Sequence, residues 1–264
     1  MLTNAFTKAM RDQRRALVGW TTGIMLLVLM EAAIWPSMRD MGNIQQLLAN
    51  YPEAMRELFN LEDFGTGIGF MNAELFSALM PLLFVIFGIS RGARAIAGEE
   101  ESGTLEILLA TPLSAARLVL QQAAALAASL AVLATALFAA VAVLSPVFGL
   151  GIEIGDAATG SLAMALLGFE FGALALAVGA ITGRRVVAIA VASIAAVAAY
   201  VLYAFGKLVS AVEPWQPLSP FHQALGTGPL GAGLPPTYAW MALAAVIVIA
   251  MAMPVFERRD IAVH

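Results

Sequence analysis

The sequence predicts an all-α membrane protein with six transmembrane helices, and three observations lead to this fold class. First, 61% of its 264 residues are apolar and only 12% are charged, whereas soluble domains are about half apolar and about a quarter charged. Second, the mean hydropathy is +0.86. Third, the apolar residues form long continuous runs rather than the alternation of barrel strands. This composition excludes a disordered chain, a nucleic-acid binder and a small secreted scaffold, and it argues against a soluble enzyme.

Six runs are long enough to cross a bilayer core of about 30 Å, which needs about 20 residues of helix. We expect these spans at 16–35, 74–90, 118–144, 157–182, 186–206 and 237–256. No loop between them has room for a sizeable soluble domain. The sequence therefore predicts a single transmembrane domain over residues 1–264.

The positions of Lys and Arg predict the orientation, because cytoplasmic loops carry the excess of these residues. With the N-terminus inside, 11 of the 14 basic residues face the cytoplasm: Lys8, Arg11, Arg14, Arg15, Arg91, Arg94, Arg117, Arg184, Arg185, Arg258 and Arg259. No small-x-small cleavage site follows the first run, so we expect a retained span and not a signal peptide. The prediction is a multi-pass protein of the inner or plasma membrane with both termini in the cytoplasm.

The N-terminal segment 3–15 precedes the first span and combines a short apolar face with several basic residues. Phe6, Met10 and Leu17 share one helical face, and basic residues surround it. This pattern favours an interfacial helix that lies on anionic lipid. The alternative is a solvated basic anchor that only fixes the topology.

Two outer loops follow from the span assignment. In 36–73 we expect short amphipathic helices interrupted by Pro52, and then a flexible turn at the glycine-rich GTGIG segment, 65–69. The loop 207–236 contains six Pro residues, which suggests short re-entrant or interfacial helices before the sixth span. His222 stands there without a second His, and the chain has no Cys, so we expect no metal site.

The inner loop 91–117 carries the most informative pattern. An acidic run, 99–101, precedes an apolar segment, 104–110, that can form a short helix. Pro112 ends this helix, and Ser114 can cap the third span. Apolar side chains exposed to the cytoplasm need a partner. The alternative is that this helix folds back onto the membrane surface, although its acidic neighbours disfavour an anionic leaflet.

The segment from Ala95 to Pro112, with Gly98, Gly103 and the E-x-E-x-G-T-L-E-x-L-L spacing, resembles permeases of the type-2 ABC exporter (ABC-2) family. The resemblance extends to the six spans and the large first outer loop. It implies that two permease subunits pair, as a homodimer or with a related permease, and that each docks a separate cytoplasmic ATPase, which binds ATP and Mg. It also implies that the inner loop forms the coupling helix, and that the cargo is a drug, antibiotic, lipid or glycan leaving the cell.

The resemblance also assigns roles to residues. The ATPase-coupling residues that it implies are Glu99, Glu101, Thr104, Leu105, Glu106 and Leu108. The chain itself has no G-x-x-x-x-G-K-[ST] phosphate loop, because its only Gly-Lys pair, 206–207, is followed by Leu. We therefore expect a non-catalytic transport subunit that binds no cofactor and no nucleic acid, and whose partners are an ATPase, a second permease, membrane lipid and a small-molecule cargo.

Two carboxylates fall inside the apolar runs. Glu170 lies midway along the fourth span, where an ionised group must face a cavity, find a partner or take up a proton. It marks either a pathway site or an inter-helix hydrogen bond. Glu31 lies near the outer end of the first span, where contact with water or a neighbouring helix is favoured over a pathway role.

Four glycines recur on nearly one face of the fourth span: Gly168, Gly172, Gly179 and Gly183. Small residues let helices approach closely, so this stripe predicts tight helix packing. The sequence does not say whether the neighbour belongs to the same subunit or to its mate.

Two other functions compete with the exporter hypothesis. A secondary transporter or channel would use Glu170 as a proton or ion carrier, but the spans carry no paired acid and base groups. A membrane-embedded enzyme would need a nucleophile, base or metal cluster, and neither H-E-x-x-H nor G-x-S-x-G occurs.

Overall fold

A computed structural model describes residues 4–41, 56, 63–104 and 114–259 of the chain, and within these ranges it contains helices and no strands. The first span is α1 (Ala5–Arg39). The second span is one continuous helical segment made of α4 (Gly67–Met71), η1 (Asn72–Leu79), α5 (Met80–Ala93), η2 (Arg94–Gly98) and α6 (Glu99–Glu101). They are followed by α8 (Ala115–Phe148), α9 (Ile154–Thr182), α10 (Arg185–Leu208), the short η3 (Glu213–Leu218) and α11 (Pro220–Leu225), and α12 (Thr237–Glu257).

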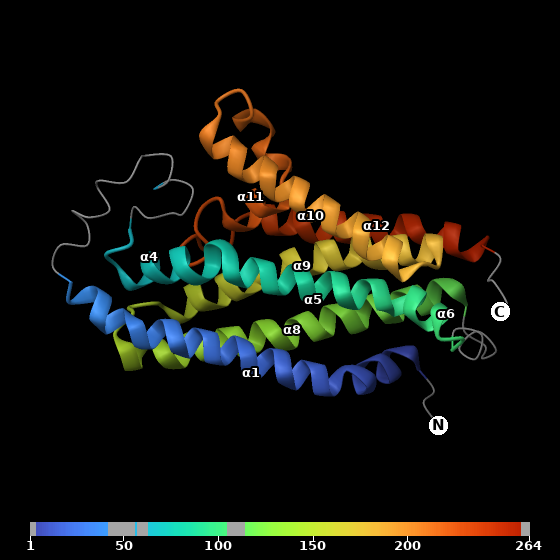
Figure 1. Cartoon of the computed structure of the whole chain (residues 1–264), viewed down its shortest axis with the longest axis horizontal. Coiled ribbons are helices and arrows are strands. Elements are labelled where there is room, and N and C mark those ends of the chain that lie inside the picture. The colour runs from blue at the N-terminus through green and yellow to red at the C-terminus, as the bar shows by residue number, and fades with distance from the viewer. Residues whose placement is uncertain (1–3, 42–55, 57–62, 105–113, 260–264) are drawn as a thin grey trace.

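Six of these helical segments are long and apolar enough to cross a membrane, which confirms the predicted number of spans within the described ranges. They lie side by side along the long axis of the molecule, and α10 leans away from the others with α11 near its end (Figure 1). Both termini lie at the same end of the bundle, which we call the terminal end. Ser114 caps α8 as predicted, since its hydroxyl accepts a hydrogen bond from the Arg117 amide at 3.3 Å.

Residues 5–15, which the sequence suggests as an interfacial helix, form the first part of α1 and continue without a break into the first span. Asn4 caps this long helix by accepting a hydrogen bond from the Phe6 amide. This N-terminal part packs along α8, where the Ala5 amide donates to Gln121 Oε1 at 2.9 Å and Gln13 bonds to Ser129. Contacts with α8 therefore fix the direction of this segment, and an interfacial position stays a prediction.

The second span begins earlier than predicted. Of the GTGIG segment, which the sequence predicts to be a flexible turn, only Gly65 and Thr66 precede the helix. Thr66 caps α4 by accepting a hydrogen bond from the Gly69 amide at 3.0 Å, so Gly67 and Gly69 belong to the first helical turn. A Cβ atom on Gly67 would lie 2.1 Å from the Leu150 carbonyl oxygen. Gly67 thus permits close backbone contact with the α8–α9 connection, and Gly69 permits close contact with Asp63.

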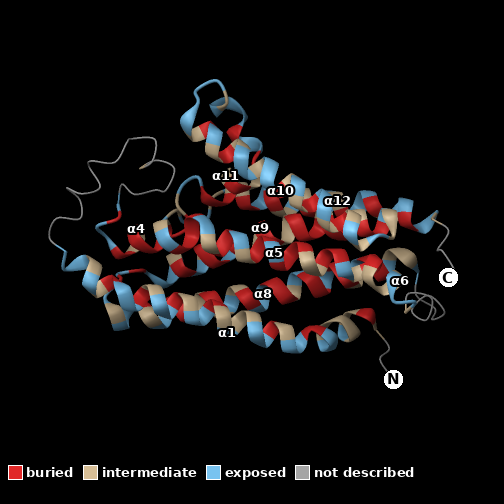
Figure 2. Cartoon of the chain, in the orientation of Figure 1, coloured by how far each residue is buried: buried red, intermediate tan, exposed pale blue. Residues whose placement is uncertain are grey.

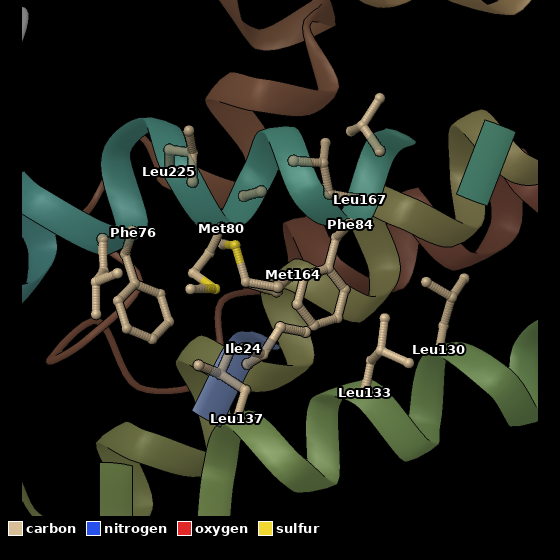
Figure 3. Close-up of a cluster of buried hydrophobic side chains, with 14 of the residues drawn as sticks. Ile24, Phe76, Met80, Phe84, Leu130, Leu133, Leu137, Met164, Leu167 and Leu225 are labelled. Carbon is tan, nitrogen blue, oxygen red and sulfur yellow. The ribbon is translucent and has the colours of Figure 1, made fainter. Parts of the chain in front are cut away.

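The core is built around α9, which packs against α5, α8, α10 and α12. Large apolar side chains from four spans and α11 meet there (Figure 3), and those labelled in the close-up are Ile24, Phe76, Met80, Phe84, Leu130, Leu133, Leu137, Met164, Leu167 and Leu225. The outward faces of α1, α10 and α12 are exposed yet apolar (Figure 2), for example at Val186 and Met251. These faces suit acyl chains or a second membrane subunit as their surroundings.

The segment between α10 and α12 lies at the loop end of the bundle, opposite the terminal end, and is bonded back to α10. Gln216 donates a hydrogen bond to the Tyr203 carbonyl at 2.9 Å, and Ser219 donates to the Ala199 carbonyl at 2.7 Å. These bonds fold η3 and α11 back along α10. Two short helices are thus present where the sequence suggested them, and their depth in the membrane stays a prediction. The amphipathic helices expected around Pro52 fall in 42–55 and 57–62, outside the described residues.

Candidate functional site

The acidic run predicted for the inner loop forms α6, at the terminal end of the second span (Figure 1). We call Glu99, Glu100 and Glu101 the acidic junction. It stands directly before Thr104 and the segment 105–113, which lies outside the described residues. Each of the three carboxylates reaches a different part of the bundle.

Glu99 joins the second span to α1. Lys8 donates to Glu99 Oε1 at 2.6 Å and also contacts Oε2. The Thr104 hydroxyl donates to the same carboxylate, and the Thr104 amide donates to the Glu99 carbonyl at 2.9 Å. Glu99 therefore fixes both the N-terminal helix and the first residue of the predicted coupling segment.

Glu100 joins the second span to the end of α12 through an ion pair with Arg259. Only 13% of the Glu100 side chain and 17% of the Arg259 side chain are exposed. The pair lies against Gly183, where a Cβ atom would approach Glu100 Oε2 to 2.7 Å. Gly183 ends α9 with a φ of +66°, which favours glycine, so space and backbone geometry both select it.

Glu101 joins the second span to the start of α10. Its Oε1 atom accepts a hydrogen bond from the Arg185 backbone amide at 2.9 Å. This amide opens α10, where no side chain of the same segment caps the helix. The carboxylate therefore acts as a cap supplied from another helix, and it also suits the positive end of the helix dipole.

Of the predicted coupling residues, the structure brings Glu99, Glu101 and Thr104 together, whereas Leu105, Glu106 and Leu108 lie outside the described residues. Their contact with an ATPase stays a prediction. Sequence reasoning missed the intrachain partners Lys8, Arg185 and Arg259. Their placement on one side of the membrane was available from the charge distribution, but their pairing with particular carboxylates was not.

Glu170 lies half-buried on α9, between the two ends of the bundle. Its Oε2 atom is buried without a hydrogen-bond partner among the described residues. Glu31 lies partly buried on α1. The roles proposed for both carboxylates stay predictions.

The glycine stripe of α9 meets a second pair of glycines on α5. A Cβ atom on Gly88 would lie 2.0 Å from the Gly168 carbonyl oxygen, and one on Gly92 would lie 2.0 Å from the Gly172 carbonyl oxygen. The two helices therefore touch through their backbones, within one chain. Gly179 has only ordinary contacts, the nearest being Ala97 Cβ at 3.4 Å.

On the loop side, burial and then the charge of Lys207 lower the pKa of His222 below its ordinary value of 6.5. His222 belongs to α11, between the fifth and sixth spans. Its Nδ1 atom is buried without a hydrogen-bond partner in the described part of the chain. The same part contains no group of three His, Cys, Asp or Glu residues that could hold a metal ion.

The six long apolar helices define a multi-pass α-helical membrane protein. The chain matches the family described as ABC-2 family transporter protein over residues 3–261, so it belongs to that family and is an ABC permease subunit. Such permeases are membrane transport subunits that normally work with an ATPase subunit. None of the curated proteins compared with the chain matches it.

Proposed function

We propose that the chain is the transmembrane subunit of an ATP-driven exporter for an amphipathic or hydrophobic compound, such as a drug, an antibiotic or a lipid-like molecule. ATP and Mg bind to a separate ATPase subunit, and a second permease, identical or related, completes the unit. The terminal end of the bundle faces the cytoplasm. Family membership supports the partnership with an ATPase, and the 11 basic residues assigned to one side support the orientation.

The observation that carries the mechanism is the acidic junction. It stands at the end of the second span, immediately before 105–113, the segment implied to dock on the ATPase. Movement of that segment is transmitted to α1 through the Glu99–Lys8 ion pair and to the end of α12 through the Glu100–Arg259 ion pair. It is transmitted to α10 through the hydrogen bond from the Arg185 amide to Glu101. Closure of the ATPase pair thereby moves three spans together with the second one.

An apolar groove supports a hydrophobic cargo. It has a volume of about 520 Å³ and lies between α8, α9 and α12, with Phe138, Phe169 and Val246 in its lining. Small residues such as Ala131 and Ala165 form much of the rest, so an acyl chain or a flat apolar ring has room to enter. A cargo of this kind reaches the permease from the bilayer.

The test is affinity purification of the tagged full chain from its own cells in mild detergent, with mass spectrometry of the retained proteins. We expect an ATPase with a G-x-x-x-x-G-K-[ST] loop, and we expect its loss in Leu105→Asp and Glu106→Arg. Leu234→Asp is the matched control, because Leu234 is 70% exposed and lies in the loop before α12. Equal recovery of the ATPase by all three variants would overturn the coupling role of 105–113.

A secondary transporter that uses Glu170 as a proton carrier is the second candidate. The buried Oε2 atom of Glu170, which has no hydrogen-bond partner among the described residues, favours it. The same purification separates the two. Recovery of the chain without any ATPase, together with uptake driven by a proton gradient and lost in Glu170→Gln, would replace the exporter proposal.

A further inference from the structure

A polar cavity of about 440 Å³ opens at the terminal end of the bundle, between α1, the end of the second span, α8 and the start of α10. Three arginines line it: Arg91, Arg94 and Arg185. Ala125 and Leu126 supply an apolar wall. The cavity therefore combines three guanidinium groups with an apolar wall at the end of the membrane spans.

The three guanidinium groups have no carboxylate within 4.0 Å among the described residues. Arg91 lies over the Phe87 ring at 5.6 Å, and Arg185 Nε is buried without a hydrogen-bond partner in the part of the chain that the structure describes. A buried guanidinium nitrogen without an acceptor is costly. The cavity thus presents unused donors.

The carboxylates that line the same cavity are already engaged. Glu99 binds Lys8, and Asp12 lies 3.9 Å from the same ammonium group. Glu101 accepts the Arg185 backbone amide. With Lys8 included, four positive charges face three negative ones, which leaves one positive charge to be balanced.

We propose that this cavity binds a phosphate ester with one negative charge, through Arg91, Arg94 and Arg185. The planar guanidinium fork matches phosphate oxygens in a bidentate arrangement. A phosphodiester carries the single negative charge that the site lacks. Basic pockets between membrane helices at this depth bind lipid headgroups, so an anionic phospholipid such as phosphatidylglycerol is the source we expect.

The test uses the purified full chain in phospholipid-free detergent and measures its unfolding temperature with added lipid. Arg185→Gln and Arg184→Gln form a matched pair, since Arg184 is adjacent and exposed but does not line the cavity. We expect phosphatidylglycerol, but not phosphatidylcholine, to stabilise the wild type and Arg184→Gln. Arg185→Gln should need at least about tenfold more lipid for the same shift, and Arg185→Lys should fall between them.

A second arm separates the two sources of a phosphate ester. Soluble glycerophosphoglycerol, a phosphodiester with the same single negative charge and no acyl chains, is added alone at millimolar concentration. Stabilisation that depends on Arg185 to the same extent would assign the site to a soluble ester. If Arg185→Gln differs from wild type in size exclusion or in unfolding temperature before any ligand is added, Arg94→Gln replaces it as the cavity variant, because Arg94 is exposed. Equal stabilisation of wild type and both cavity variants, or none by either compound, overturns the proposal. No ATPase or cargo is needed, so the outcome is independent of the exporter proposal.

Discussion

The backbone contact between α5 and α9 gives the sharpest prediction for stability. In Gly92→Ala the new Cβ atom would lie 2.0 Å from the Gly172 carbonyl oxygen, and 3.4 Å is the start of the ordinary contact range. One helix must therefore recede by about 1.4 Å, or the backbone must distort. Gly88→Ala meets the Gly168 carbonyl oxygen in the same way. Backbone atoms have no alternative rotamer, so the clash cannot be relieved by a side-chain movement.

Overpacking of a well-packed core costs about 1–3 kcal/mol, and this site belongs near the upper end of that range because both surfaces are backbone. For a chain of this size, 1 kcal/mol corresponds to a shift of roughly 2–4 °C in unfolding temperature. We therefore expect Gly88→Ala and Gly92→Ala each to unfold roughly 4–10 °C below wild type. The assay is thermal unfolding in detergent, followed by the loss of the monodisperse peak in size exclusion.

Gly155→Ala is the matched control, since Gly155 lies on α9 and an added Cβ would have no atom within 4 Å. Alanine favours a helix over glycine by about 0.5–1 kcal/mol, so this variant should unfold at or slightly above the wild-type temperature. If Gly88→Ala and Gly92→Ala behaved like Gly155→Ala, the proposed contact between the two helices would be refuted.

Three further predictions concern the two ends of the bundle. Asn72→Ala should destabilise the chain by about 2–4 kcal/mol in thermal unfolding, because Asn72 holds the buried amide and carbonyl of Leu230 at 3.1 and 2.9 Å. Glu100→Gln should cost about 2 kcal/mol in the same assay, because Arg259 loses its ion-pair partner while only 17% of its side chain is exposed. Since the pKa of His222 is lowered in the folded chain, the unfolded chain takes up a proton first, so stability should fall as the pH drops below 6.5. His222→Gln should flatten this decline between about pH 7.5 and pH 5.

Each of these changes has a comparison variant. For Asn72 it is Thr135→Ala, because the Thr135 hydroxyl is exposed and bonds only within its own helix. For Glu100 it is Glu153→Gln, an exposed carboxylate that makes no capping hydrogen bond at the start of α9. If Asn72→Ala and Glu100→Gln lost no more stability than these comparison variants, the Asn72–Leu230 and Glu100–Arg259 contacts would contribute nothing to stability. For His222, an equal loss of stability in wild type and in His222→Gln as the pH falls would count against a lowered pKa.

The number and approximate position of the spans could be predicted, because each apolar run is long and charges separate it from the next. The start of the second span could not be predicted. The glycines in GTGIG suggest a turn as long as the backbone segments that pack against them are unknown. Here Gly67 and Gly69 permit contacts with Leu150 and Asp63. The same limit applies to residues 5–15, whose amphipathic pattern suits a membrane surface as well as it suits α8.

The candidate site was predicted in composition but not in connectivity. The acidic run and its position after the second span follow from local sequence. Its partners Lys8 and Arg259 are far away along the chain, and only the packing of α1 and α12 brings them to α6. The glycine stripe on α9 was likewise recognised without its partner, although Gly88 and Gly92 have the same four-residue spacing as Gly168 and Gly172.

In the proposed exporter, a separate ATPase moves this bundle from its terminal end. The chain contains no Cys, so cysteines introduced at Met41 and Leu234, both exposed at the loop end, would carry the only two spin labels. The measurement is the label-to-label distance distribution in the lipid-reconstituted complex with the ATPase, diluted with unlabelled chain, with and without trapped ATP. We expect ATP to shift the distribution, and we expect Glu100→Gln to reduce the shift while the ATPase stays bound. Identical distributions with and without ATP, in a complex that hydrolyses ATP, would refute the proposed coupling.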